Sequence, residues 1–136
     1  MTVRVEVDDD AEGFAAMLAA LIESNLTRRP ERARLLRPAT VGLEATDAGT
    51  VATVRLRPGL VRVETGQDSA SPLRIRASSR DLLSMASTPL HLGLPDVATS
   101  QGRAVLAAVV GGRIRIRGLL RHPVALSRFA RLLSVA

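Results

Sequence analysis

The chain has 136 residues, a net charge of +6 and a hydrophobic content of 46%, which fit one domain with a core of ordinary size. It has no cysteine, which excludes disulfides and thiolate chemistry and agrees with a cytoplasmic location. The chain has no run of about 18 apolar residues, so no membrane-spanning helix is predicted. Its start, MTVRVEVDDD, has no apolar stretch typical of a secretory signal.

All 19 basic residues are arginine. This bias is typical of a GC-rich bacterial genome, and it lowers the weight of any one arginine as a phosphate ligand. Phe14 and Phe129 are the only aromatic residues, so the chain lacks the stacking platforms of proteins that bind single-stranded nucleic acid. Nucleic acid is therefore not the expected partner, although a basic surface could still bind duplex phosphates.

The first half of the chain predicts a helix followed by three strands. Apolar residues recur at helical spacing over residues 10–26, from Phe14 to Ile22. After a basic connector the apolar period changes to two, which predicts an antiparallel meander. Its strands cover 41–45, 51–57 and 60–64, and Pro58-Gly59 is a strong turn pair between the last two.

The second half predicts two more strands and three helices. A strand over 73–77 leads into SSRDLLSMAS, a helix that Ser78 caps, with Asp81 three residues later. An apolar loop over 88–95 and a short apolar helix over 101–110 follow. A fifth strand over 113–117 precedes a last helix that starts near Pro123, a residue favoured in a first helical turn.

Two of these segments, LRIRASSRDLLSMAS (73–87) and GRIRIRGLLRHPVALSRFARLL (112–133), resemble the sterol carrier protein type 2 family. The family pattern is a strand, a capped helix with an acid-Leu-Leu step, an apolar segment, a strand ending in glycine and a C-terminal helix. Asp81-Leu82-Leu83 matches the step, and Gly118 matches the glycine. The resemblance implies an α+β fold, in which a five-stranded, mainly antiparallel sheet has helices packed on one face. It implies one domain over 1–136, with a first helix at about 10–26 and the sheet and other helices over 39–134.

The resemblance also implies a non-catalytic protein that binds or carries a lipid-like apolar ligand (a sterol, a fatty acyl chain or an isoprenoid) in a hydrophobic cavity. Small-ligand pockets are mostly apolar, and the C-terminal half is more apolar than a loop and a short helix require. The predicted lining residues, each of which could instead be ordinary core, are Leu82, Leu83, Met85, Leu90, Leu92, Leu94, Val105, Leu106, Val109, Leu126, Phe129 and Leu133. His91 is a candidate polar contact to a ligand hydroxyl or carboxylate.

Arginines alternate with apolar residues along the strands, which predicts one apolar sheet face and one face dense in arginine. An ordinary solvated face, enriched by codon usage, explains this pattern. The functional interpretation is docking to an anionic membrane surface or an acidic protein, with candidates Arg74, Arg76, Arg113 and Arg115. The alternative hypothesis for the whole chain is an interaction module without a ligand, which uses this face to bind an acidic partner or nucleic acid.

Nothing in the sequence indicates an enzyme. His91 and His122 are the only histidines, and no Cys or carboxylate spacing around them predicts a metal site. G-x-S-x-G, P-loop and G-x-G-x-x-G motifs do not occur. We therefore expect no catalytic residues, no metal and no cofactor. The oligomeric state stays open, with a homodimer as one alternative.

Overall fold

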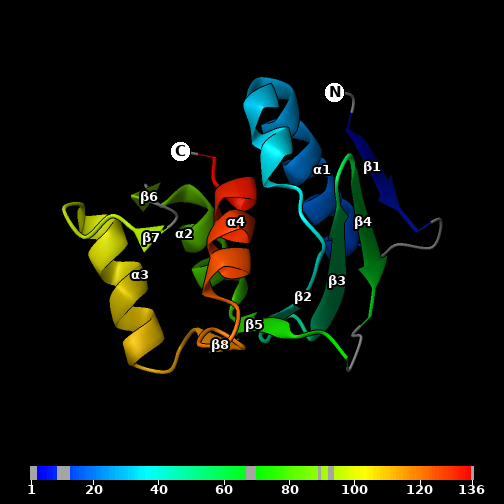
Figure 1. The fold of residues 1–136 in the computed structure, drawn as a ribbon. Helices are drawn as coiled ribbons and strands as arrows, with labels where there is room; N and C mark the ends of the chain where they lie inside the picture. Colours follow the sequence, from blue (N-terminus) through cyan, green and yellow to red (C-terminus); the bar gives the residue numbers. More distant parts are fainter. Residues whose placement is uncertain (1–2, 9–12, 67–69, 89, 92–93, 136) are drawn as a thin grey trace.

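The computed structural model describes residues 3–8, 13–66, 70–88, 90–91 and 94–135 (Figure 1). Over these ranges the chain forms a six-stranded sheet in the order β1-β4-β3-β2-β5-β8. Its strands are β1 (Arg4–Val7), β2 (Ala39–Ala45), β3 (Thr50–Arg57), β4 (Leu60–Thr65), β5 (Leu73–Ala77) and β8 (Arg115–Arg117). The helices are α1 (Gly13–Arg28), the 3-10 helix η1 (Pro30–Leu35), α2 (Ser79–Ser87), α3 (Ser100–Val110) and α4 (Pro123–Leu133).

The α+β class and the mainly antiparallel sheet are confirmed, but the predicted number of strands is wrong. The sheet has six strands because Arg4–Val7 pairs in parallel with β4 at its edge. Four residues that alternate charged and apolar side chains give a weak strand signal, and the paired edge of β4 decides their conformation. The apolar loop over 88–95 contains a second small correction, since Leu90–His91 (β6) and Leu94–Pro95 (β7) pair as a short antiparallel hairpin.

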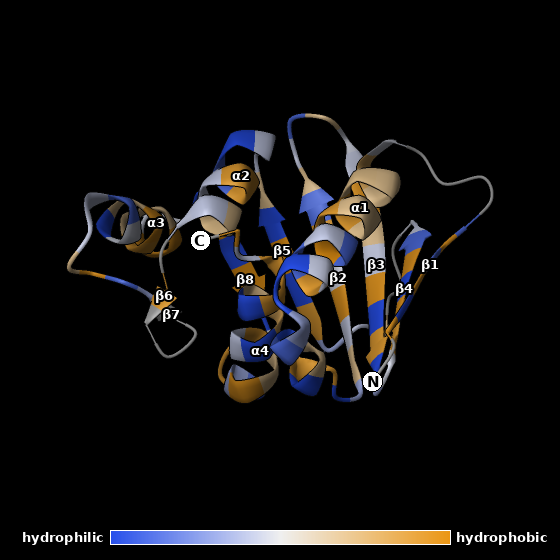
Figure 2. Cartoon of the chain, turned by 90° about the horizontal axis from the view of Figure 1, so that it is seen from above, coloured by the Kyte–Doolittle hydropathy of each residue, from blue (hydrophilic) through white to orange (hydrophobic). Residues whose placement is uncertain are grey.

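The inner face of the sheet is a continuous apolar layer. Val54 lies opposite Val41 and Val63, and Ile75 lies opposite Leu43 and Ile116, so apolar rows cross the sheet from strand to strand. Figure 2 shows the alternation as orange and blue bands along the strands. Ala15, Leu18, Ala19 and Ile22 of α1, together with Phe129 and Leu132 of α4, join these rows in one buried core. The sheet is thus covered on one side, as its period-two pattern predicts.

The helix α1 is fastened to the end of α4 by a buried amide. Asn25 is 1% exposed, and its Nδ2 donates to the carbonyl oxygen of Leu132 at 2.9 Å. Its Oδ1 accepts from Nη2 of Arg28 at 2.6 Å. A helix leaves its last carbonyls without intrahelical partners, so Asn25 supplies a donor that the end of α4 needs.

We expect Asn25→Ala to lower the free energy of unfolding by about 1–3 kcal/mol, because it leaves the buried carbonyl of Leu132 without this donor. Urea denaturation measures the change. Ser24→Ala, at the exposed neighbouring position, is the control and should leave stability within about 0.5 kcal/mol of the original protein. Equal stability of the two variants would show that the amide does not hold α4.

The chain leaves the last strand through a tight approach at Gly118. The φ of Gly118 is +90°, and a Cβ at this position would lie 2.1 Å from the carbonyl oxygen of Pro72. Only glycine meets both conditions, since other residues rarely adopt positive φ and their side chain would overlap the carbonyl. Gly118 therefore lets the end of β8 lie directly against the start of β5.

Gly118→Ala should destabilise the protein by at least about 1–2 kcal/mol, the approximate cost of left-handed backbone in a residue with a Cβ. The matched control is Gly13→Ala at the start of α1, where a Cβ would meet nothing within 4 Å. Thermal unfolding of both variants tests the expectation. A Gly118→Ala protein as stable as Gly13→Ala would contradict it.

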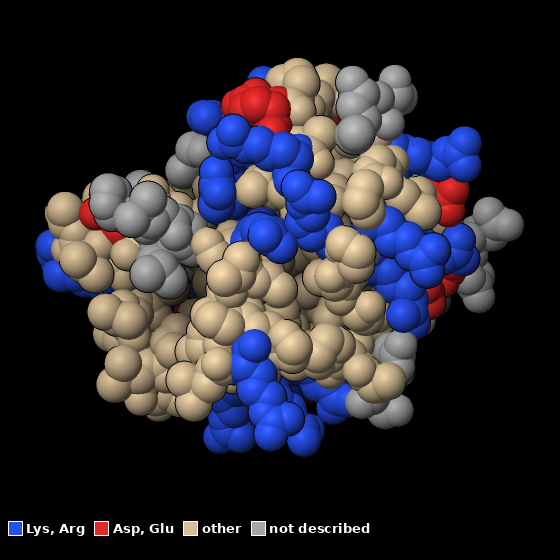
Figure 3. Space-filling view, in the orientation of Figure 1, with Lys and Arg blue, Asp and Glu red and all other residues tan. Residues whose placement is uncertain are grey.

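On the face of the molecule where α4 lies, basic side chains gather at the upper and the lower end, with uncharged side chains between them (Figure 3). In the described part of the chain, every helix falls short of the length and apolarity needed to cross a bilayer.

Candidate functional site

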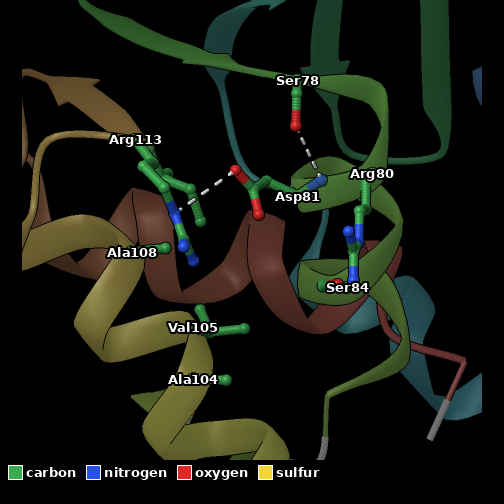
Figure 4. Close-up of a pocket in the computed structure, with 9 residues that line it drawn as sticks. Ser78, Arg80, Asp81, Ser84, Ala104, Val105, Ala108 and Arg113 are labelled. Atoms are coloured by element: carbon green, nitrogen blue, oxygen red, sulfur yellow. Dashed lines mark hydrogen bonds and ion pairs between the residues drawn. The ribbon is translucent and has the colours of Figure 1, made fainter.

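A cleft of about 400 Å³ opens between α2, α3 and the segment that leads into β8 (Figure 4). Its size is within the usual range of small-ligand pockets, about 300–1,000 Å³. The lining is apolar toward α3 and the core and polar toward α2. The lining residues are Ser78, Arg80, Asp81, Ser84, Ala104, Val105, Ala108, Arg113 and Ile114.

The polar side of the cleft is built on the start of α2. Ser78 caps this helix, as the sequence predicts, and its Oγ accepts from the backbone N–H of Asp81 at 3.1 Å. The Asp81 carboxylate points toward Arg113, whose Nε lies 3.9 Å from Oδ2. Arg80 also lies at the cleft and is exposed. The rim therefore presents two guanidinium groups beside one carboxylate.

The same end of α2 is held to the β2–β3 turn by Asp47. Its Oδ1 accepts from the backbone N–H of Ser79 at 2.8 Å and from the Ser79 hydroxyl at 3.0 Å. These two hydrogen bonds hold the pKa of the Asp47 carboxyl below its ordinary value of 3.8, and the bond from the backbone N–H has the larger effect. The contact therefore stabilises α2 at neutral pH and is lost as the pH falls through 3.8 and then through the lower pKa of the folded protein.

An NMR titration should place the Asp47 midpoint below 3.8. In Ser79→Ala the midpoint should rise part of the way toward that value, because the backbone N–H of residue 79 still donates. Ser87→Ala, at the exposed far end of α2, should leave the midpoint unchanged. A midpoint at or above 3.8 in the original protein would show that the turn does not hold α2 in solution.

The apolar side of the cleft comes from α3 and the residue before β8. Val105, Ala108 and Ile114 are buried and form its floor. The Thr99 side chain caps α3 by accepting from the N–H of Gly102 at 3.0 Å, and a Cβ on Gly102 would lie 1.9 Å from the carbonyl oxygen of Asp96. Ala104 and Ala108, four residues apart, share one side of α3. Their small side chains leave the space that the cleft occupies.

The predicted lining residues are distributed over several environments. Val105 lines the cleft, and Phe129 is fully buried in the core. Leu83 and Leu106 are exposed, at 62% and 44%. Leu92 and the side chains of His91 and Leu94 lie outside the described residues. The remaining members are half-buried, and all except Leu90 pack against the core: Leu82, Met85, Leu90, Val109, Leu126 and Leu133.

Sequence reasoning missed most of the cleft. Arg80 and Ser84 are one helical turn apart on α2, and Ala104 and Ala108 are one turn apart on α3. The second pair carried a usable signal, since two alanines at this spacing mark a side where a helix leaves room. The polar residues of the cleft gave no signal, because most exposed residues on a short helix are polar.

The strand register gathers arginines on the outer sheet face, as predicted, and it also brings acids among them, which the prediction did not include. Register places Glu6 beside Arg62 and Glu44 beside Arg76. Short ion pairs follow, with Arg55 Nε at 2.7 Å from Glu64, Arg62 Nη2 at 3.0 Å from Asp8 and Arg76 Nη2 at 3.2 Å from Glu44. The acids of this face pair with Arg4, Arg55, Arg62 and Arg76.

Three of the four predicted docking arginines, Arg74, Arg76 and Arg115, share the outer sheet face, and Arg113 does not. Arg74 and Arg76 lie on β5, opposite Arg117 and Arg115 of β8. Arg113 precedes β8, which begins at Arg115 rather than at residue 113, and it lines the cleft. Gly111 and Gly112 end α3 and place Arg113 on the helix side.

Another basic group lies where η1 meets the end of α4. Burial, and then the charge of Arg29, lower the pKa of Arg32, with smaller contributions from Arg28 and Arg131. Arg32 donates to the carbonyl oxygen of Ser134, as Arg28 does to Asn25. Arg32 therefore holds η1 to the C-terminal segment, whereas the bond of Arg28 lies within α1.

The cleft can hold a ligand through burial, charge and hydrogen bonds. Its serine hydroxyls and guanidinium groups suit oxygen atoms of a ligand, while its apolar floor suits hydrocarbon. Among the described residues, no group of three or more His, Cys, Asp or Glu residues is placed to hold a metal ion.

No family model and no curated protein sequence matches the chain. Among solved structures it is similar to the ubiquinone synthesis protein UbiJ-SCP2, with a TM-score of 0.62, 15% identity and coverage of 88% of this chain and 92% of that one. It also aligns, at a TM-score of 0.46 and 14% identity, over 99% of this chain and 96% of the other, with a conserved hypothetical protein from Thermus thermophilus, described as a candidate sterol carrier protein. The assignment of the fold depends on the similarity to UbiJ-SCP2. The resemblance seen in the sequence is confirmed for the architecture, and the fold of this chain is that of the sterol carrier protein type 2-like domains.

Proposed function

We propose that this chain binds a lipid-like apolar ligand with a polar head, without catalysing a reaction, in the cleft between α2 and α3. The observation that carries the proposal is the division of the cleft into an apolar floor and a charged rim. Val105, Ala108 and Ile114 form the floor, and Arg80 and Arg113 lie at the rim. The sterol carrier-like fold supports the broader statement that the ligand is a lipid.

Burial drives binding of the apolar part of such a ligand. Each square ångström of hydrocarbon removed from water contributes about 25 cal/mol, and this requires no reactive side chain. The rim adds specificity for the head, because a carboxylate or phosphate would interact with the two guanidinium groups. The Asp81 carboxylate lies 3.9 Å from the Arg113 guanidinium. This distance is long enough for an anionic head group to compete with Asp81 for the guanidinium.

The ligand class can be narrowed by the choice of probes. A fatty acid and a fatty alcohol of equal chain length separate the contribution of the rim from that of the floor. An isoprenoid quinone belongs in the set because UbiJ-SCP2, which has the same fold, is described as a ubiquinone synthesis protein. Native mass spectrometry of the purified protein identifies any lipid that remains bound through purification.

We expect Ala104→Leu to fill the cleft and to lower the affinity for a fluorescent fatty acid about ten-fold or more, since the added side chain occupies the space of the ligand. Ala107→Leu is the matched control. It makes the same change on the same helix at an exposed position outside the cleft lining, and it should leave uptake within about two-fold of the original protein.

Circular dichroism should give the same unfolding midpoint for both variants, so that a loss of uptake reports the cleft. Equal uptake by Ala104→Leu and Ala107→Leu would place the ligand elsewhere. Absence of uptake in the original protein, together with absence of a co-purified lipid, would contradict the proposed function.

A further inference from the structure

Three large apolar side chains project into solvent at one end of the molecule. Val110 is 82% exposed, Leu120 is 95% exposed and Val124 is 60% exposed. Val110 ends α3, Leu120 lies in the turn after β8, and Val124 lies in the first turn of α4. In Figure 1 all three segments lie toward the lower end of the molecule, while Figure 2 shows α3 apart from α4. A side chain as exposed as Leu120 contributes almost nothing to the core of its own domain.

The turn that carries Leu120 is closed rather than extended. The backbone N–H of His122 donates to the carbonyl oxygen of Gly118 at 2.9 Å, so the intervening residues form a compact loop. Leu120 is the middle residue of this loop, and Arg121 is exposed beside it. The chain thus presents a leucine at the tip of a closed turn next to a permanent positive charge.

The surroundings of this tip are basic. Arg115 and Arg117 of β8 are exposed and immediately precede the turn, and Figure 3 shows basic side chains gathered at the lower end of the molecule. No Asp or Glu occurs after Asp96, whereas the same forty residues hold Arg103, Arg113, Arg115, Arg117, Arg121, Arg128 and Arg131. Arg113 pairs with Asp81 at 3.9 Å, whereas Arg115, Arg117 and Arg121 form no ion pair with an acid among the described residues.

We propose that the β8–α4 edge, defined by Val110, Arg115, Arg117, Leu120, Arg121 and Val124, docks on an anionic phospholipid bilayer. The arginines attract the phosphate groups of the lipid surface. Leu120 and Val124 enter the apolar layer beneath those groups, where burial of their exposed side chains is favourable. The edge is thereby complementary to a bilayer in both charge and polarity.

Other anionic partners fit this edge less well. Duplex nucleic acid would pair with the arginines but would leave Leu120 in water, and the chain offers no exposed Phe, Tyr or Trp on which unpaired bases could stack. An acidic protein would need an apolar pocket matched to the tip. A bilayer accommodates an isolated leucine flanked by cations without such a pocket.

Sedimentation with vesicles tests the proposal. The original protein should bind vesicles of phosphatidylcholine mixed with phosphatidylglycerol, should bind vesicles of phosphatidylcholine alone at least about ten-fold more weakly, and should dissociate as sodium chloride is added. Leu120→Ser and Arg121→Glu should each lower binding to the anionic vesicles about ten-fold or more.

Two controls match these variants in chemistry but not in position. Arg57→Glu reverses an exposed arginine at the end of β3, and Met17→Ser removes an apolar side chain that is 52% exposed on α1. Both should bind anionic vesicles within about two-fold of the original protein, since they lie outside the β8–α4 edge. Comparable losses in Arg57→Glu and Arg121→Glu would reduce the effect to net charge and overturn the assignment of the edge.

Three other outcomes would also overturn it. They are failure of the original protein to bind anionic vesicles, undiminished binding by Leu120→Ser, and binding to duplex DNA that is tighter than binding to vesicles and unaffected by Leu120→Ser. Uptake of a fluorescent fatty acid, measured without vesicles, reports the cleft independently. The edge variants should keep that uptake, so failure of the docking proposal and failure of the proposed function are distinguishable.

Discussion

The close contact between Gly118 and Pro72 is the constraint on which the C-terminal third of the structure depends. β8 is only three residues long, and it is held to β5 by antiparallel pairing. Because Gly118 has no side chain and takes a positive φ, the chain can reverse directly over the start of β5. This reversal starts α4 at Pro123 and brings Phe129 and Leu132, both fully buried, onto the core.

The same reversal explains why Leu120 is so exposed. Leu120 is the middle residue of the turn closed between Gly118 and His122, and its side chain lies in solvent. The exposed leucine therefore follows from the geometry that covers the sheet, and the arginines on either side of it oppose self-association through this apolar tip.

Sequence reasoning succeeded where the local signal and the tertiary structure agree. The Pro58-Gly59 turn, the Ser78 cap and the apolar phase of β3 and β5 are each encoded within a few residues, and the structure has all of them. The edge strand β1 could not be read this way, since its four residues become a strand only through pairing with β4. The acids of the outer face could not be predicted for a related reason. Glu6 and Glu44 are distant from Arg62 and Arg76 in sequence, and only the strand register brings each acid beside its arginine.

The candidate site was harder to predict because it depends on what the helices leave empty. A list of large apolar residues points to the core as readily as to a cavity, and Phe129 belongs to the core. The cleft arises instead where small side chains, Ala104 and Ala108, face the polar start of α2. Space of this kind is a property of two packed helices, so neither helix alone encodes it.

The helix α3 links the two proposals. One of its sides carries Ala104 and Ala108 at the cleft, and its last residue, Val110, belongs to the β8–α4 edge. Among the described residues, α3 packs against α2 and β7 more closely than against the main sheet. Elements with few buried contacts open most readily. A bilayer that holds Val110 would therefore contact the helix that forms the apolar side of the cleft.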